Sequence, residues 1–178
     1  MTILFIIFAI ITATFLLTVF FGAPFVPSRR TELKKAFSEL YPLSPTDTLI
    51  DVGSGSGTVL RAAATYKPKR LVGYEINPFL VLISKILCRK LPNTQILCRN
   101  FLHTQFPKDT TVVYIFGVDH LIPRLAAKIQ ESVDRSSRPI YLISYGFRLP
   151  NQKPTKTLDA LFLYKISPAK PSSQNPQT

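Results

Sequence analysis

The chain contains 178 residues, enough for one domain and few for two, and its 46% hydrophobic content excludes a disordered or low-complexity protein. Twenty-two Lys and Arg against ten Asp and Glu give a formal net charge of +12, which favours anionic surroundings such as phospholipid, nucleic acid or an anionic ligand. The two cysteines, Cys88 and Cys98, lie in apolar stretches without paired spacing, so we expect reduced, buried thiols rather than a disulfide or a zinc site.

An uncharged apolar run extends from Ile3 to Phe21 and contains three threonines as its only polar residues. As a helix rising about 1.5 Å per residue it would be roughly 30 Å long, the thickness of a bilayer core. Threonine hydroxyls can donate to carbonyls of the preceding helical turn, so they do not oppose insertion. We therefore predict a transmembrane anchor over residues 1–23.

A cleaved signal peptide is the alternative interpretation of this run. No Lys or Arg precedes it, it is longer than a usual signal-peptide core, and no A-x-A cleavage site follows, which favours an uncleaved anchor. Four basic residues, Arg29, Arg30, Lys34 and Lys35, come directly after it. The positive-inside rule therefore predicts a single-pass membrane protein whose domain lies on the cytoplasmic side, or on the matrix side of a mitochondrial membrane.

Residues 24–47 are predicted to connect the anchor to the domain. The prolines in 23–28 interrupt a helix, so we expect a short extended joint, and its last residue, a serine, suits a helix N-cap. Leu33, Phe37 and Leu40 follow at i, i+4 and i+7, which predicts a short amphipathic helix.

From residue 48 onward, short β-rich runs alternate with helical runs. We predict strands at 48–52, 70–74, 94–98, 111–116 and 140–145 and helices at 58–66, 78–90 and 120–133. This alternation is typical of an α/β fold, a doubly wound, mostly parallel Rossmann-like sheet. A last run at 160–166 follows too closely for a crossover helix and predicts an antiparallel edge strand. The domain then covers 48–166, and the proline-rich tail 167–178 is predicted to be disordered.

A glycine-rich turn, Asp51-Val52-Gly53-Ser54-Gly55-Ser56-Gly57, ends the first predicted strand. Ligands of open α/β sheets bind at this edge, where glycines allow close backbone approach and a helix start presents unpaired N–H groups. A dinucleotide fingerprint would need Gly or Ala in place of Thr58, and a P-loop would need a following Lys. The Asp51 carboxylate repels phosphate and suits a ligand with a positively charged amino group.

Further polar residues follow the second and third predicted strands. Glu75 ends the second strand, where a carboxylate can accept hydrogen bonds from two ribose hydroxyls. Asn77 suits the N-cap of a helix that begins at Pro78. Asn100 and Phe101 follow the third strand and can supply a polar group and a flat surface for a base.

Together these residues resemble the class I S-adenosylmethionine-dependent methyltransferases. The resemblance implies that the glycine-rich turn holds the methionine part of the cofactor, that Glu75 holds the ribose and that Asn100 holds the adenine. Most members have Asp where this chain has Asn100. As candidate cofactor-binding residues we take Asp51, Gly53, Ser54, Gly55, Gly57, Glu75, Asn77, Asn100 and Phe101.

A narrower resemblance is carried by the apolar anchor and by four motifs, PFVPS, DVGSGSG, GYEINPFLV and VVYIFGV. These are similar to the membrane-anchored protein-lysine methyltransferases of mitochondria, the ATP synthase c subunit and adenine nucleotide translocase lysine methyltransferase family, and to their bacterial relatives. The resemblance implies S-adenosylmethionine as cofactor, a membrane protein as substrate and a phospholipid bilayer as partner.

Relatives continue after the fourth strand with Pro and a polar residue, where this chain has Asp119 and His120. Methyl transfer from a sulfonium depends mainly on orientation, but a lysine must lose a proton before its nitrogen can attack. Asp119 and His120 are therefore the candidate catalytic residues. The alternative is that Asp119 caps the next helix and His120 is solvated.

Five basic residues, Lys67, Lys69, Arg70, Arg89 and Lys90, are not interleaved with aromatics, and no nucleic-acid-binding module is recognisable. We expect attraction to anionic lipid, no nucleic-acid partner and no metal. No NPPY-like tetrapeptide follows the fourth strand, which disfavours a nucleic-acid methyltransferase. Two alternatives remain open: methylation of a lipid or quinone-like molecule, and a non-catalytic membrane adaptor.

Overall fold

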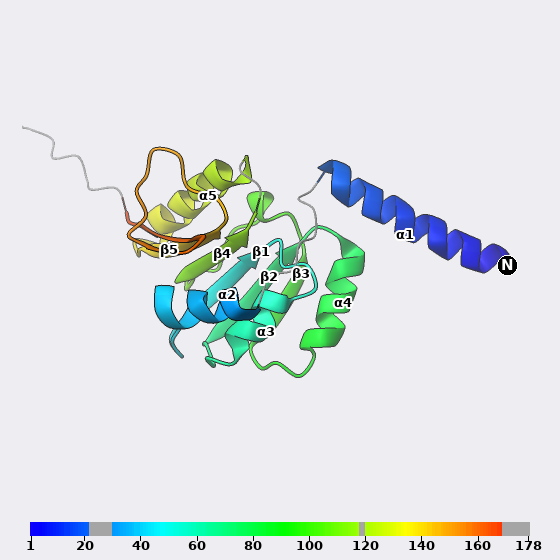
Figure 1. Cartoon of the computed structure of the whole chain (residues 1–178), viewed down its shortest axis with the longest axis horizontal. Coiled ribbons are helices and arrows are strands. Elements are labelled where there is room, and N and C mark those ends of the chain that lie inside the picture. The colour runs from blue at the N-terminus through cyan, green and yellow to red at the C-terminus, as the bar shows by residue number, and fades with distance from the viewer. Residues whose placement is uncertain (22–29, 118–119, 169–178) are drawn as a thin grey trace, which may run out of the picture.

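A seven-stranded sheet forms the centre of the domain in the computed structural model (Figure 1). The structure describes residues 1–21, 30–117 and 120–168, with the side chains of the first helix described as far as Ala13. The strands are β1 (Thr48–Val52), β2 (Arg70–Glu75), β3 (Thr94–Cys98), β4 (Val112–Phe116), β5 (Ile140–Tyr145), β6 (Lys156–Leu158) and β7 (Leu161–Ile166). The helices are α1 (Thr2–Phe21), α2 (Arg30–Lys35), α3 (Thr58–Ala64), α4 (Pro78–Cys88) and α5 (Leu121–Ser136), with a π-helical turn η1 (Ala36–Leu40) and a 3₁₀ turn η2 (Phe101–His103).

The strand order is β3-β2-β1-β4-β5-β7-β6. The first five strands in this order are parallel, β7 runs antiparallel to β5, and β6 runs antiparallel to β7. Every residue of β1 is buried because helices cover both faces of the sheet at its centre, as in other parallel sheets. The predicted α/β, mostly parallel sheet with an antiparallel edge is therefore confirmed.

The outermost strand, β6, was not predicted from the sequence. It has only three residues, of which two are exposed, so it lacks the apolar alternation that would reveal it. Asp159 adopts a positive φ of 51° in the turn to β7, and Leu158 pairs with Leu161 across that turn. This hairpin covers β7, so the longer strand does not present an open edge.

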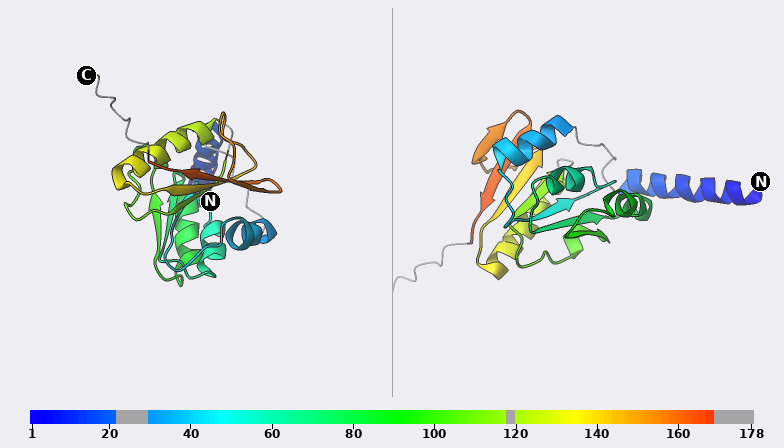
Figure 2. Two further views of the ribbon diagram at one scale, coloured as in Figure 1. Left: turned by 90° about the vertical axis from the view of Figure 1, so that its left-hand side faces the viewer. Right: turned by 90° about the horizontal axis from the view of Figure 1, so that it is seen from below.

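One face of the sheet is covered by α2, η1, α3 and α4 (Figure 2). Leu33, Phe37 and Leu40 are buried there against the sheet, as their spacing predicted, although the helix changes from α to π geometry at Ala36. Tyr114 of β4 packs against Phe37, with ring centroids 5.8 Å apart.

The other face is covered by α5 and η2. Ile122, Leu125, Ile129 and Val133 of α5 are fully buried and form one apolar stripe at helical spacing. The helix extends three residues beyond the predicted end, to Ser136, and stops where Ser137 adopts a left-handed φ of 54°.

The N-terminal run forms the helix α1, and the apolar side chains along its described part are exposed. Thr12 Oγ1 donates to the carbonyl of Phe8 at 2.8 Å, as predicted for a threonine in this run. Among the residues that the structure describes, no helix is long and apolar enough to cross a membrane. The predicted joint at 23–28 and positions 169–178 of the predicted tail lie outside the described residues.

Both cysteines are free thiols, as predicted, but only Cys88 is buried. The prediction of a buried thiol was wrong for Cys98. This residue ends β3, the strand at one edge of the sheet, where only Ile96 is buried. An edge strand has no neighbouring strand on one side, so its apolar residues are covered less completely.

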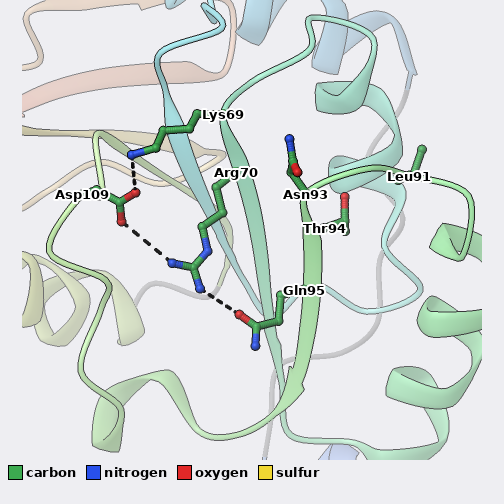
Figure 3. A pocket seen from close by; sticks show the side chains of 7 residues that line it. All are labelled: Lys69, Arg70, Leu91, Asn93, Thr94, Gln95 and Asp109. Carbon is green, nitrogen blue, oxygen red and sulfur yellow. Dashed lines mark hydrogen bonds and ion pairs between the residues drawn. The ribbon is translucent and has the colours of Figure 1, made fainter.

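Asp109 joins the amino-terminal ends of β1 and β2, at the end of the sheet opposite the glycine-rich turn (Figure 3). Its carboxylate lies 2.9 Å from Lys69 Nζ and 3.9 Å from Arg70 Nη1, and it accepts a hydrogen bond from Thr48 Oγ1 at 3.1 Å. The hydrogen bond from Lys69 lowers the pKa of Asp109 below its ordinary value, although partial burial opposes this shift. A pocket at this edge is lined by Lys69, Arg70, Leu91, Asn93, Thr94, Gln95 and Asp109, none of which is a predicted site residue.

We expect Asp109→Asn to lower the free energy of unfolding at neutral pH by about 0.2–1 kcal/mol, the usual range for a partly exposed ion pair. Because the folded state favours the carboxylate, this stabilisation is complete above the ordinary pKa of 3.8 and disappears as the pH falls through the lower folded-state pKa. Urea denaturation of both proteins at neutral and acidic pH measures the difference. An equal difference at both pH values would contradict the role of the charge.

Candidate functional site

The glycine-rich loop leaves the carboxyl end of β1 and is attached to the end of β2. The N–H groups of Gly53 and Ser54 both donate to the carbonyl of Tyr74, at 2.8 and 3.0 Å, and Gly57 N donates to Ser54 O at 2.8 Å. Gly53, Gly55 and Gly57 have φ values of 75°, 51° and 77°, which side chains other than glycine rarely tolerate. The sequence therefore needs glycine at all three positions to turn the chain into α3.

Glu75, the last residue of β2, holds this loop and the start of α4 in one arrangement. The side chain is 6% exposed, its Oε2 accepts from Gly55 N at 2.9 Å, and its Oε1 accepts from Asn77 N at 2.9 Å. The Asn77 side chain accepts from Phe79 N and Leu80 N, so the predicted N-cap is confirmed. Each carboxylate oxygen can accept a second hydrogen bond, which leaves capacity for a ligand.

Asp51 lies beside Glu75 in a more enclosed position. It is 2% exposed, and its Oδ2 has no hydrogen-bond partner among the described residues. Burial raises the pKa of the Asp51 carboxyl well above its ordinary value, and the charge of Glu75 raises that pKa further. A buried oxygen without a partner is costly, and a positively charged amino group would satisfy it. The site thus fits the amino end of a methionine-like ligand.

Three residues that position the loop were missed by the sequence analysis. A Cβ on Gly57 would lie 2.5 Å from Ser84 Oγ and 2.8 Å from Cys88 Sγ, so α4 packs directly on the loop. A Cβ on Gly73 of β2 would lie 2.7 Å from Ser54 Oγ. The available signal was a glycine inside an apolar strand, which often marks a close approach of another segment.

The remaining predicted residues lie around this group. Arg99 N donates to Glu75 O at 2.9 Å, and Asn100 follows as an exposed residue whose side chain accepts from Leu102 N at 3.0 Å. Phe101 is 9% exposed and packs in the core on the α5 face. His120 is exposed at the start of α5 and makes no side-chain cap there.

Asp119 lies outside the described residues. No group of three or more His, Cys, Asp or Glu side chains in the described ranges is placed to hold a metal ion.

The strand order and the acid-bounded glycine loop define a class I S-adenosylmethionine-dependent methyltransferase. A family model described as the ANTKMT methyltransferase domain matches residues 51–156, which is more than half of the chain. The chain belongs to this family. The comparison with curated proteins gives no match.

Solved structures of methyltransferases share the fold. An RNA methyltransferase from Salinibacter ruber in complex with S-adenosyl-L-homocysteine has a TM-score of 0.68 at 24% identity, over 84% of this chain and 99% of that one. A dimethyladenosine transferase from Plasmodium falciparum has a TM-score of 0.57 at 16% identity, over 68% and 43% of the two chains. A geranyl diphosphate methyltransferase in complex with S-adenosylmethionine has a TM-score of 0.51 at 16% identity, over 65% and 48%.

We expect Asp51→Asn to weaken S-adenosylmethionine binding by about 10- to 100-fold, the usual value of a hydrogen bond to a charged group. The same change is expected to stabilise the ligand-free protein at neutral pH. The raised pKa of Asp51 means that wild-type stability falls as the pH rises from 3.8 through the folded-state pKa, and the amide has no such loss. Calorimetric titration and thermal denaturation measure the two effects. Undiminished affinity in the variant would contradict the proposed contact.

Proposed function

We propose that this protein transfers a methyl group from S-adenosylmethionine to a lysine side chain of a membrane protein. The observation that carries the cofactor assignment is the buried Asp51 oxygen without a described partner, adjacent to the acid-anchored loop. Membership of the ANTKMT methyltransferase domain family and the resemblance of the motifs around Asp51 and Glu75 to membrane-anchored lysine methyltransferases support lysine as the acceptor.

The residues present suggest how the cofactor would be held. Asp51 would accept from the amino group of its methionine part, and Glu75 would accept from its ribose hydroxyls with the lone pairs that Gly55 and Asn77 do not use. A Cβ at Gly53 would meet no atom within 4 Å, so the backbone of the loop is open to close approach there. Asn100 stands at the next strand end, where the resemblance implies adenine recognition. When bound, the cofactor supplies the electrophilic methyl group.

The protein would then have to orient the acceptor lysine and remove its proton. His120 precedes α5, which follows β4 along the chain, and Asp119 precedes His120 in the sequence. We assign these two residues the task of accepting the lysine proton, because only the neutral amine has a lone pair for attack.

Membrane attachment through α1 is part of the same proposal. The sequence from Ile3 to Phe21 carries no charge, the helix extends from Thr2 to Phe21, and apolar side chains such as Phe5 and Phe8 are exposed along its described part. Exposed apolar side chains in such number usually mark a surface that another apolar medium covers, and attachment of this helix to a membrane would confine the enzyme close to a membrane substrate and raise its effective concentration. The basic residues after α1 favour a domain on the cytoplasmic or matrix side.

Incubation of the purified full chain with membranes and methyl-labelled S-adenosylmethionine tests the proposed reaction. We expect acid hydrolysis of the membrane protein fraction to release labelled methyl-lysine. Asp51→Ala removes the carboxylate that would hold the cofactor and should abolish the label at cofactor concentrations that saturate the wild type. Label in the lipid extract would instead indicate a lipid or quinone-like acceptor. Cofactor binding without any label would overturn transfer to these membranes.

A second measurement concerns His120 alone. We expect His120→Gln to lower kcat by about 100-fold or more, the usual size of general-base assistance, while the affinity for S-adenosylmethionine stays unchanged. The loss should be greatest at neutral pH and should shrink at high pH, where the substrate lysine deprotonates without help. A pH-independent loss would indicate that His120 positions the acceptor and does not take its proton.

A further inference from the structure

Helix α4 is apolar on two opposite faces. Val81, Ser84 and Cys88 point inward and are buried against the sheet and the glycine loop. On the opposite side, Phe79 is 44% exposed, Leu82 56% and Ile86 51%, and Leu87, 50% exposed, lies at the side of the helix between the two faces. The spacing of Phe79, Leu82 and Ile86, at i, i+3 and i+7, makes them one continuous surface, which we call the outer face of α4.

The outer face of α4 differs from that of the other long helix in the domain. The exposed positions of α5 include Arg124, Glu131 and Asp134, which is the usual composition of a helix facing water. A contiguous set of large apolar side chains on a helix surface usually marks a surface that a partner protein or a membrane covers. The exposed surfaces of α4 and α5 therefore differ in composition, although both helices pack on the same sheet.

The charges around the outer face favour a membrane over a second protein chain. Lys85, Arg89 and Lys90 are exposed in and just after α4, and the helix contains no acidic residue. Large apolar side chains flanked only by Lys and Arg are typical of helices that lie in the headgroup region of an anionic membrane. A second copy of the chain, which carries the same +12 charge, would be repelled from this basic surface.

The position of α4 agrees with a membrane contact. Figures 1 and 2 both show α4 on the side of the domain from which α1 extends. At eleven residues α4 is too short to span a bilayer, but it can lie along its surface. The side chain of its N-cap Asn77 accepts a hydrogen bond from Phe79 N, and the backbone N–H of Asn77 donates to Glu75. The outer face therefore begins next to the candidate cofactor residues.

We propose that the outer face of α4 lies on the surface of an anionic phospholipid membrane, with its apolar side chains in the headgroup–acyl boundary and its basic residues at the headgroups. This contact deepens the proposed function and rests on one part of it, that the methyl acceptor is a membrane protein. It places the open edge of the cofactor loop at the bilayer surface, and the substrate class is then a lysine at the membrane–water boundary of its protein.

The absence of tryptophan from the sequence allows a direct test on the full chain. In Leu82→Trp, mixed with phosphatidylcholine–phosphatidylglycerol vesicles, we expect the emission to move to shorter wavelengths and to be quenched by lipids brominated on their acyl chains. Ala127→Trp places the same probe at an exposed position of α5 and should show neither change. Changing Lys85, Arg89 and Lys90 to Gln in the Leu82→Trp protein should remove most of the quenching, because each basic residue near an anionic surface is worth about fivefold.

Flotation of the same vesicles separates this proposal from anchoring by α1. Chains that float while Leu82→Trp remains unquenched would overturn the α4 contact and leave the anchor intact. A Leu82→Trp chain that also carries Ile7→Lys and Ile11→Lys tests α1. If it floats fully and its tryptophan is quenched, anchoring by α1 is overturned and the α4 contact is supported. A shift to shorter wavelengths without lipid that grows with protein concentration would mean that a second copy covers the outer face, and would overturn the membrane contact.

Discussion

The Glu75 carboxylate is the interaction on which the arrangement of the site depends. Its two oxygens accept the N–H groups of Gly55 and Asn77, and thereby join the loop after β1 to the start of α4. Neither N–H belongs to a strand ladder or to a helix interior, so the carboxylate gives both of them a hydrogen-bond acceptor in a buried place. The same residue would bind the ribose under the proposed function, and its structural and ligand-binding roles would then use different lone pairs of one carboxylate.

The second acid of the site has the opposite energetic character. Asp51 is buried beside Glu75, and its Oδ2 has no described partner, so the ligand-free fold bears the cost of a desolvated, repelled carboxyl. A cationic amino group bound there would offset both the desolvation and the repulsion. The free energy that the buried Asp51 carboxyl costs the ligand-free fold would be recovered when the ligand binds. Such a trade of folding stability against binding is common at functional sites.

The exposed surfaces of the helices differ in composition. α5 presents charged side chains to water, whereas α4 presents Phe79, Leu82 and Ile86, and α1 presents apolar residues along its described part. Charge and hydropathy on the α4 side both suit a phospholipid surface. A methyltransferase that meets its substrate at a membrane would gain orientation from such a surface, and orientation is most of what methyl transfer from a sulfonium requires.

Apolar periodicity and turn residues are local signals, so the sequence by itself determined the main strands and helices and their order along the chain. It also determined the antiparallel edge strand, the glycine loop with Asp51, and the positions of Glu75 and Asn77. Only the tertiary structure decided that β6 completes the sheet, that Ser84, Cys88 and Gly73 shape the loop, and that Cys98 is exposed. It also decided which side of α4 faces outward. A helix that is apolar on two opposite faces has no sequence period that tells the core face from the exposed one, so the distinction arises only when one face packs against the sheet.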